Sequence, residues 1–184
     1  DFLGYKNLVG AFYQPKAVII DPDVLKTLTK RQFNNGLSES IKMSATSDAE
    51  LFSLLEDNNA EDIIDTVIEK SLLIKKAVVE EDEKEHGIRK VLNFGHTVGH
   101  AIESVNLGNL YHGECVGLGM LYFCNHSVKQ QLIEVLKKYN LPTNIDYVKD
   151  EIVSLIEHDK KATSNGVNIV FVKNIGEYEL KKLT

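Results

Sequence analysis

The chain has 184 residues and a net charge of −6 at pH 7, with 43% hydrophobic and 26% charged residues. This length suits one domain with a substantial core, or one large domain that carries a fragment of another. The acidic balance argues against a nucleic-acid-binding surface, and no apolar run approaches membrane-spanning length. No secretory signal pattern is present, and Cys115 and Cys124 form no metal or redox motif. We therefore expect a globular, cytoplasmic protein without a nucleic-acid or membrane partner.

The first elements of the chain lie around an apolar run at Ala17–Ile20, which is followed by Asp21-Pro22-Asp23. This run predicts one short buried strand. Because a lone strand has no hydrogen-bond partners, we expect it to be the last strand of a sheet domain that these residues do not include. Asp23 is expected to cap a short helix that ends at Thr29.

Two units are predicted along the chain. Residues 1–30 are interpreted as an edge or remnant of an N-terminal nucleotide-binding domain with its linker, and residues 31–184 as a helical domain. The chain begins at Asp1 rather than at a methionine, which we interpret as an excised piece of a longer protein.

Between Gly36 and His158 the apolar residues recur with a helical period. A first helix is expected from Gly36, with a break near Thr46–Asp48. A charge run at Glu80–Lys84 and an Asn/Gly-rich link at Asn106–Asn109 predict loops. The further helices expected here are Glu61–Val79, a histidine-bearing helix, a buried Gly113–Asn125, an amphipathic Val128–Tyr139, and Tyr147–His158.

The pattern changes to alternation near the C-terminus. Val167, Ile169 and Phe171 alternate with other residues, and Tyr178 and Leu180 follow a turn signal at 174–176. This predicts a β-hairpin. The expected fold is therefore mainly α, with several helices, a short N-terminal strand and a C-terminal hairpin.

The histidines most indicative of a functional site lie between Arg89 and Glu114. His96 and His100 are four residues apart, so both imidazoles lie on one face if this segment is helical. Gly95 and Gly99 would allow a ligand or a second helix to approach closely. The segment differs from the HExxH zinc motif, because Thr97 stands where that motif has glutamate.

Two interpretations of this histidine pair are open. In one, it combines a core histidine with an exposed one. In the other, His112 completes a metal site, since imidazoles with a carboxylate are the ligands of catalytic zinc. Spacing alone favours His96 with His100 as the ligand pair. Acids and amides that could serve the histidines are Asn93, Glu103 and Glu114.

The histidine segment, RKVLNFGHTVGHAIE followed by YHGECVGLGM, resembles the signature of the 3-dehydroquinate synthase family. Three further segments are similar to that family: KNLVGAFYQPKAVIIDPDVLKTL, NNGLSESIKM and KKAVVEEDEKEHGIRK. The resemblance covers almost the whole chain. It implies the C-terminal, metal- and substrate-binding domain of the dehydroquinate synthase-like fold.

The resemblance implies Zn2+ (or Co2+) bound by Glu39, His96 and His112, and it implies that His100 is not a ligand. On residue type alone, Glu39 would more often be a surface residue of an amphipathic helix. His100 becomes a candidate for proton transfer and phosphate contact, because its ordinary pKa suits both. Arg89 offers a planar fork for a carboxylate or phosphate.

Other positions match active-site residues of the family, although each lysine alone would more often be a solvated charge. Asp159-Lys160-Lys161 resembles a motif whose lysine contacts phosphate, and which of the two lysines does so stays open. The further candidate catalytic residues are Asn93, Lys42, Lys75, Glu85, Lys160 and Lys161. The positions that match NAD contacts are Lys6, Asn7, Val24, Leu25, Lys26 and Thr27.

The implied activity is that of a lyase of the shikimate pathway, which serves chorismate and aromatic amino-acid biosynthesis. The family converts 3-deoxy-D-arabino-heptulosonate 7-phosphate to 3-dehydroquinate and phosphate by NAD-dependent oxidation, phosphate elimination, reduction and aldol cyclisation. The family's glycine-rich nucleotide-binding half is absent from this sequence. We therefore expect a chain that is inactive alone and needs this N-terminal domain, in a full-length enzyme that is a homodimer. The alternatives are a related sugar-phosphate cyclase, a metal-dependent polyol dehydrogenase, or a non-catalytic helical interaction domain.

Overall fold

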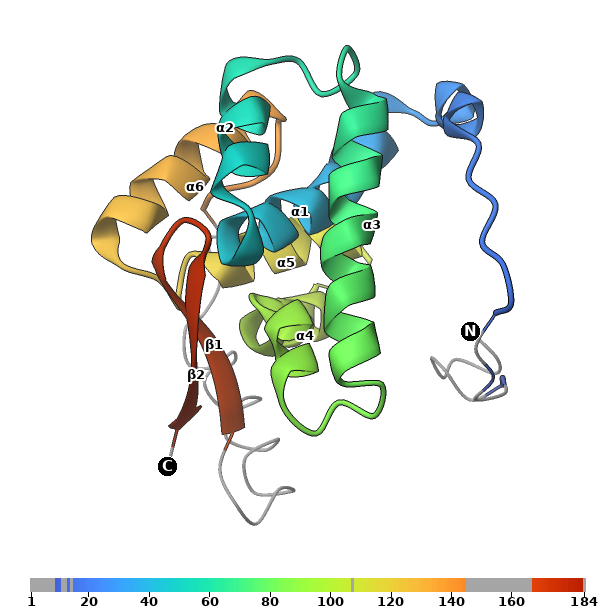
Figure 1. Ribbon diagram of the computed structural model, residues 1–184. Helices are drawn as coiled ribbons and strands as arrows, with labels where there is room; N and C mark the ends of the chain where they lie inside the picture. Colours follow the sequence, from blue (N-terminus) through green and yellow to red (C-terminus); the bar gives the residue numbers. More distant parts are fainter. Residues whose placement is uncertain (1–8, 11–12, 14, 107, 145–166, 184) are drawn as a thin grey trace.

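The structure is a computed structural model that describes residues 9–10, 13, 15–106, 108–144 and 167–183. Its described part is a helical body with one antiparallel hairpin packed against it (Figure 1). The mainly α fold with a C-terminal hairpin is therefore confirmed. The elements are the 3-10 helix η1 (Pro22–Thr27), α1 (Lys30–Ser47), α2 (Ala49–Asp57), α3 (Ile64–Glu81), the 3-10 helix η2 (Ile88–Asn93), α4 (His96–Val105), α5 (His112–Met120), α6 (His126–Lys138), β1 (Val167–Asn174) and β2 (Glu177–Leu183).

Helix α1 begins at a side-chain cap and ends at Asp48, whose side chain caps the next helix. At its start, Thr29 and Gln32 form a capping box, in which the Gln32 amide oxygen accepts the backbone N–H of Thr29 at 3.1 Å. At its end, Asp48 accepts the backbone N–H of Leu51 at 2.9 Å and so starts α2. The predicted break near Thr46–Asp48 is confirmed. The predicted start at Gly36 was too late, because this glycine lies inside the helix.

The main core lies between α1, α2, α3 and α6. It contains Ile41 from α1, Phe52 from α2, Val67 from α3 and Leu132 from α6, all at most 1% exposed. Removing this apolar area from water is the principal stabilising contribution to the helical body. Figure 1 shows α1 in the centre of this arrangement, with α3 along one side and α4 and α5 below it.

Helices α4 and α5 pack closely because glycines line their contact. A Cβ atom on Gly119 would lie 2.0 Å from the carbonyl oxygen of Gly95, and one on Gly99 would lie 3.1 Å from that of Cys115. A larger side chain at either position would push the two backbones apart. The expectation that Gly95 and Gly99 admit a second helix is thus met by α5.

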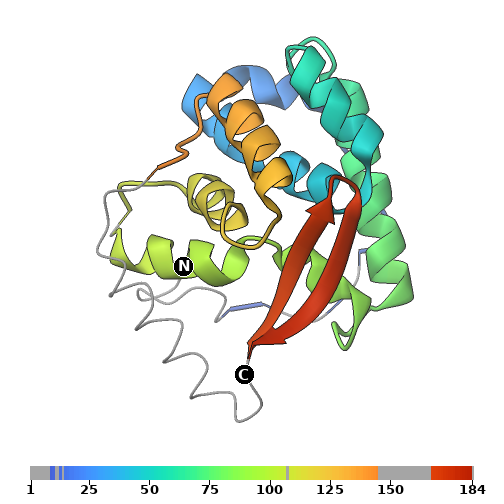
Figure 2. The same cartoon turned by 90° about the vertical axis from the view of Figure 1, so that its left-hand side faces the viewer.

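The hairpin lies against the helical body (Figure 2), and backbone hydrogen bonds join it to α1 and to the loop between α5 and α6. Val172 donates to the carbonyl oxygen of Phe123 at 2.9 Å, and Asn125 donates to that of Val172 at 3.1 Å. At the turn, Gly176 donates to Ala45 of α1 at 2.9 Å. The strands pair from Val167 with Leu183 to Asn174 with Glu177.

Several element predictions need correction. Ala17–Ile20 forms no strand, and Ile19 is 95% exposed. Within the described residues no neighbouring strand offers hydrogen bonds to this run, so its apolar pattern alone does not make it a strand. The cap of η1 is Asp21, which accepts the N–H of Asp23 at 3.0 Å, and not Asp23 itself.

Other boundaries shift by a few residues. α3 begins at Ile64 and continues into the predicted charge loop as far as Glu81, and α5 ends at Met120. After Met120 the chain turns to place Cys124 beside Val172 of the hairpin, so a continuous helix to Asn125 is excluded. The predicted helix Tyr147–His158 lies outside the described residues. In the described part, no helix combines the length and apolarity that crossing a membrane requires.

Candidate metal and substrate site

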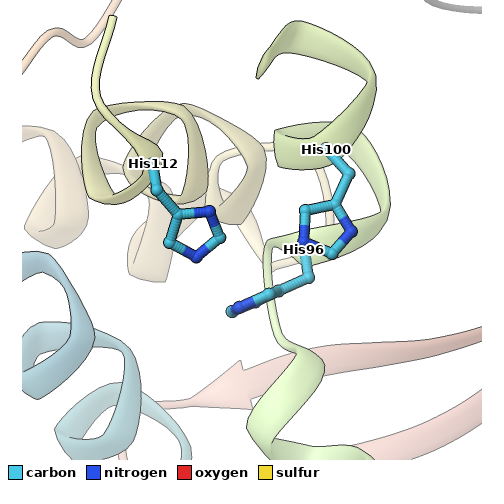
Figure 3. A group of neighbouring side chains, drawn as sticks. All are labelled: His96, His100 and His112. Carbon is cyan, nitrogen blue, oxygen red and sulfur yellow. The ribbon is translucent and has the colours of Figure 1, made fainter. Parts of the chain in front are cut away.

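Three histidines meet between α4 and α5. His96 opens α4, His100 follows one turn later, and His112 opens α5. The rings turn toward one another across the space between the helices (Figure 3). Their possible ligand atoms all lie within 4.8 Å of one another. The structure thus brings His100 into the same cluster as the two histidines that the family resemblance assigns to the metal.

Glu39 of α1 faces this cluster. Its Oε1 lies 3.8 Å from Nε2 of His96 and 3.8 Å from Nε2 of His112. This oxygen is buried and has no hydrogen-bond partner among the residues that the structure describes. A buried carboxylate oxygen without a donor is unfavourable unless a cation satisfies it, and a carboxylate with two imidazoles is a donor set that zinc accepts. The residues present therefore fit a divalent metal ion.

The electrostatics keep His96 neutral, as a metal ligand must be. Burial, and next the ammonium group of Lys42, lower the pKa of His96 to about 4. Its Nδ1 lies 3.1 Å from the carbonyl oxygen of Phe94, which holds the ring and leaves Nε2 toward Glu39.

A partly buried ion pair lies beside the cluster. Lys42 donates from Nζ to Oε2 of Glu39 at 2.6 Å, and its side chain is only 5% exposed. Burial lowers the pKa of Lys42, against the raising effect of Glu39. For Glu39, burial alone would raise the pKa, but Lys42, His96 and His112 together outweigh it and lower the pKa. Glu39 is therefore ionised, with one oxygen on Lys42 and the other toward the imidazoles.

A cavity of about 410 Å³ opens beside this pair. It brings together seven of the predicted site residues, from α1, α3, the following loop, η2 and α4. The lining residues are Glu39, Lys42, Met43, Lys75, Glu85, Arg89, Leu92, Asn93 and His96. The lining includes three cationic residues, Lys42, Lys75 and Arg89, against two acidic ones, Glu39 and Glu85, and this excess of positive charge suits an anionic ligand.

The loop before η2 is held by Asp82. Its carboxylate accepts the backbone N–H groups of His86, Gly87 and Arg89 at 2.9, 2.7 and 3.1 Å, and these bonds, the one from Gly87 first, lower the pKa of Asp82. Glu85 adopts a left-handed backbone conformation with φ 60°. Asp82 was missed at the sequence level, where the charge run suggested only a solvated loop.

Two side chains of the cavity hold each other in place. Asn93 donates from Nδ2 to Oε1 of Glu85 at 2.6 Å. Separately, the Arg89 guanidinium donates to the carbonyl oxygen of Glu83 at 2.6 Å. Asn93 therefore serves Glu85 in this structure, and no hydrogen bond from it to a histidine is found among the described residues.

His112 has a carboxylate partner of its own. Its Nδ1 lies 3.1 Å from Oε2 of Glu103 in α4, which leaves Nε2 toward Glu39. Glu114 is another predicted partner for a histidine, but in this structure it has a different role. Its carboxylate is engaged by Arg31 of α1 and by the backbone N–H of Tyr111. Burial raises the pKa of Glu114, but Arg31 and the Tyr111 N–H outweigh it and lower the pKa.

The predicted NAD contacts that the structure describes do not line the cavity beside the histidines. Val24–Thr27 lie in η1, where Leu25 and Lys26 line a second cavity of about 400 Å³ with Phe33 and Ile64. Lys6, Asn7, Lys160 and Lys161 lie outside the described residues.

Comparison with known proteins identifies the relatives of this chain. Residues 36–162 match the family described as "3-dehydroquinate synthase C-terminal", and residues 1–35 match "3-dehydroquinate synthase N-terminal". Curated 3-dehydroquinate synthases from Clostridium acetobutylicum and Clostridium beijerinckii are 45% and 42% identical to it. These alignments cover 97% and 96% of this chain, and 54% and 55% of the relatives. The chain thus spans about half the length of the curated relatives it matches.

Two solved structures share the fold. The 2-epi-5-epi-valiolone synthase of Streptomyces hygroscopicus subsp. jinggangensis, with NAD+ and Zn2+ bound, aligns with a TM-score of 0.85 at 24% identity, over 97% of this chain and 54% of that one. A 2-deoxy-scyllo-inosose synthase complexed with carbaglucose-6-phosphate, NAD+ and Co2+ aligns with a TM-score of 0.78 at 23% identity, over 100% of this chain and 57% of that one. At these identities the likeness establishes the fold.

Proposed function

Because the chain belongs to the 3-dehydroquinate synthase family, we propose that it supplies the metal- and substrate-binding half of a 3-dehydroquinate synthase. The reaction would convert 3-deoxy-D-arabino-heptulosonate 7-phosphate to 3-dehydroquinate and phosphate, in the shikimate pathway. One observation carries this proposal: Oε1 of Glu39, without a hydrogen-bond partner in the described part of the chain, faces two imidazoles beside a cavity that Lys42, Lys75 and Arg89 help to line. The 42–45% identity to curated synthases favours this reaction over that of the cyclases at 23–24%.

Glu39, His96 and His112 would hold Zn2+ or Co2+. When bound, the metal ion would lower the pKa of the substrate hydroxyl that is oxidised, and NAD would accept and return the hydride. Glu103 fixes the His112 ring, and the carbonyl oxygen of Phe94 fixes the His96 ring. The neutral state of His96 at physiological pH means that no proton must be displaced before it binds metal.

The cationic residues of the cavity would bind the acidic groups of the substrate. Arg89 and Lys75 line this cavity and are not part of the Lys42–Glu39 ion pair, so they would bind a carboxylate or a phosphate. Lys42 is committed to Glu39 and would orient that carboxylate as well as the substrate beside it. The Glu85–Asn93 pair presents polar groups to substrate hydroxyls.

His100 is the proposed proton carrier. Its ring centroid lies 5.2 Å from that of His96 and 5.7 Å from that of His112, close enough to act on a ligand held there. With Glu39 completing the metal site, His100 would move a proton at the phosphate-bearing end of the substrate. Lys160 or Lys161 would contact the phosphate.

NAD would bind partly through Lys6, Asn7 and Val24–Thr27. We place the boundary between this edge of a nucleotide-binding unit and the helical domain at residues 30/31, where α1 begins. The rest of the cofactor site would come from the nucleotide-binding half that the curated relatives carry, in a homodimeric enzyme.

The test is a chimera in which the N-terminal half of the Clostridium acetobutylicum relative precedes this chain. We expect phosphate release from the sugar acid phosphate that depends on NAD and on Zn2+, with the full-length relative as the positive control. His96→Ala in the chimera should abolish release, and the chain alone should show none. A chimera that folds and binds both NAD and Zn2+ but releases no phosphate would refute the proposed reaction.

A further inference from the structure

Helix α1 carries the candidate ligand Glu39 and also contacts the start of α5, where His112 lies. The contact is made by Arg31 and Asn35, two turns and one turn before Glu39. We propose that Arg31 is a positioning residue that fixes the first turn of α5 and thereby aims His112 at Glu39. This inference rests on the proposed metal site.

Arg31 is joined to the start of α5 by three charge-assisted hydrogen bonds. Its Nε donates to Oε1 of Glu114 and its Nη2 to Oε2, both at 2.8 Å, and Nη2 also donates to the carbonyl oxygen of Asn109 at 2.8 Å. The guanidinium carbon lies 4.3 Å from the centre of the Tyr111 ring. The planar guanidinium group provides the several N–H donors that this set of contacts needs. A lysine ammonium group would therefore reproduce only part of the set.

The carboxylate of Glu114 connects Arg31 to the backbone beside His112. The Glu114 side chain is 6% exposed, and its Oε2 also accepts the N–H of Tyr111 at 2.8 Å. One carboxylate therefore links α1 to the residue immediately before His112. Without Arg31 the nearly buried carboxylate would keep the Tyr111 N–H but lose its cationic partner, and the first turn of α5 would shift to hydrate it.

Asn35 constrains the residue on the other side of His112. Its Oδ1 accepts the backbone N–H of Gly113 at 2.8 Å and that of Glu114 at 3.3 Å. A Cβ on Gly113 would lie 2.1 Å from the backbone oxygen of Asn35, so the two helices meet backbone to backbone. His112 is thus held between two fixed neighbours, and with Glu103 orienting its ring, Nε2 points to Glu39.

The test compares Co2+ binding by the metal-free full chain and by Arg31→Gln, followed by visible absorption. We expect an affinity loss on the order of tenfold, as for other residues that orient a metal ligand, and an altered Co2+ spectrum. Arg31→Lys should recover part of the affinity. Lys30→Gln is the matched control, because it removes a neighbouring exposed ion pair to Glu61 and should leave affinity and spectrum unchanged.

Circular dichroism and thermal unfolding establish that each variant folds. If Arg31→Gln does not fold, Glu114→Gln decides by the same criteria, since it removes the charge pair with an isosteric side chain. A folded variant with wild-type Co2+ affinity and spectrum would overturn the positioning role. Absence of Co2+ binding in the wild type, or binding that survives His112→Ala, would instead overturn the proposed metal site and the inference that depends on it.

Discussion

Oε1 of Glu39, in the middle of α1, lies 3.8 Å from Nε2 of His112, the first residue of α5. This oxygen is buried and accepts no hydrogen bond from any residue that the structure describes, while the other carboxylate oxygen is held by Lys42. A cation bound between Glu39 and His112 would satisfy this carboxylate oxygen.

The first prediction concerns the charge of Glu39. Glu39→Gln keeps the size of the side chain but replaces a carboxylate ligand with a neutral amide, so Zn2+ affinity should fall by more than about tenfold. Competition with a chromophoric chelator measures this affinity. Glu50→Gln, an exposed carboxylate of α2 that pairs with Lys70, is the control and should bind Zn2+ like the wild type. Equal affinities for wild type and Glu39→Gln would exclude Glu39 as a ligand.

The second prediction concerns pH. The pKa of His96 is about 4 in the folded, metal-free chain, below the ordinary value of 6.5. Between these values the unfolded chain binds more protons than the folded one, so the free energy of unfolding should rise with pH from about 4 to about 6.5 and then level off. A shift of this size corresponds to a difference on the order of 3 kcal/mol. Urea unfolding in the presence of a chelator, at a series of pH values, measures it.

His96→Gln provides the matched comparison for this titration. Since glutamine does not titrate, the variant should lose most of the His96 contribution to the slope in the same pH interval. A wild-type slope that the variant keeps in full would show that other groups are responsible.

The third prediction concerns the close contact of α4 and α5. The Cβ of Gly119→Ala would meet the carbonyl oxygen of Gly95 and the backbone N of Gly99 at 2.0 and 2.8 Å, and neither backbone atom can move cheaply. We expect a destabilisation of about 1–3 kcal/mol, together with weaker metal binding because the histidines move apart. Thermal unfolding and Zn2+ titration measure the two effects.

Gly36→Ala is the control for this substitution. Gly36 lies within α1 with no atom near its Cβ position, so alanine should stabilise the helix by up to about 1 kcal/mol and leave Zn2+ affinity unchanged. If both variants behaved alike, the glycine contact would not be what holds α4 against α5.

The fourth prediction concerns the two cysteines. Burial raises the pKa of the Cys124 thiol to about 11, and Cys115 is fully buried. At pH 8 only about one Cys124 side chain in a thousand would be a thiolate, so a chromogenic disulfide reagent should react slowly with the native chain. In guanidinium chloride both thiols should react at once. Rapid reaction of one thiol in the native chain would contradict the burial of Cys124 beside the hairpin.

Elements with a strong local period were predictable from sequence. The alternation at Val167–Phe171 predicted the hairpin. The apolar stripe from Val128 predicted α6, with both ends correct to within two residues. The strand expected at Ala17–Ile20 was wrong, because a strand is defined by its hydrogen-bond partners and not by its own residues. For α1, the start at Lys30 was missed, although Thr29 and Gln32 carry the signal of a capping box.

For the site, local spacing placed His96 and His100 on one side of α4, and the structure shows them together with His112. Spacing could not point to Glu39, which came from the family resemblance. Neither could it reveal the contact of Arg31 with Glu114, because that contact depends on how α1 and α5 cross. The positions Arg31, Asn35 and Glu39 do recur every four residues, which marks one helix face but not what that face meets.

The capped helix α1 presents Arg31, Asn35, Glu39 and Lys42 along one stripe. Each residue of an α-helix advances the side-chain direction by about 100°. Inserting or deleting a single residue near Gly36 would rotate Arg31 and Asn35, which contact α5, relative to Glu39 and Lys42, which line the cavity. This would happen even if the helix stayed intact. The proposed site therefore depends on the number of residues between Asn35 and Glu39, and not only on their identity.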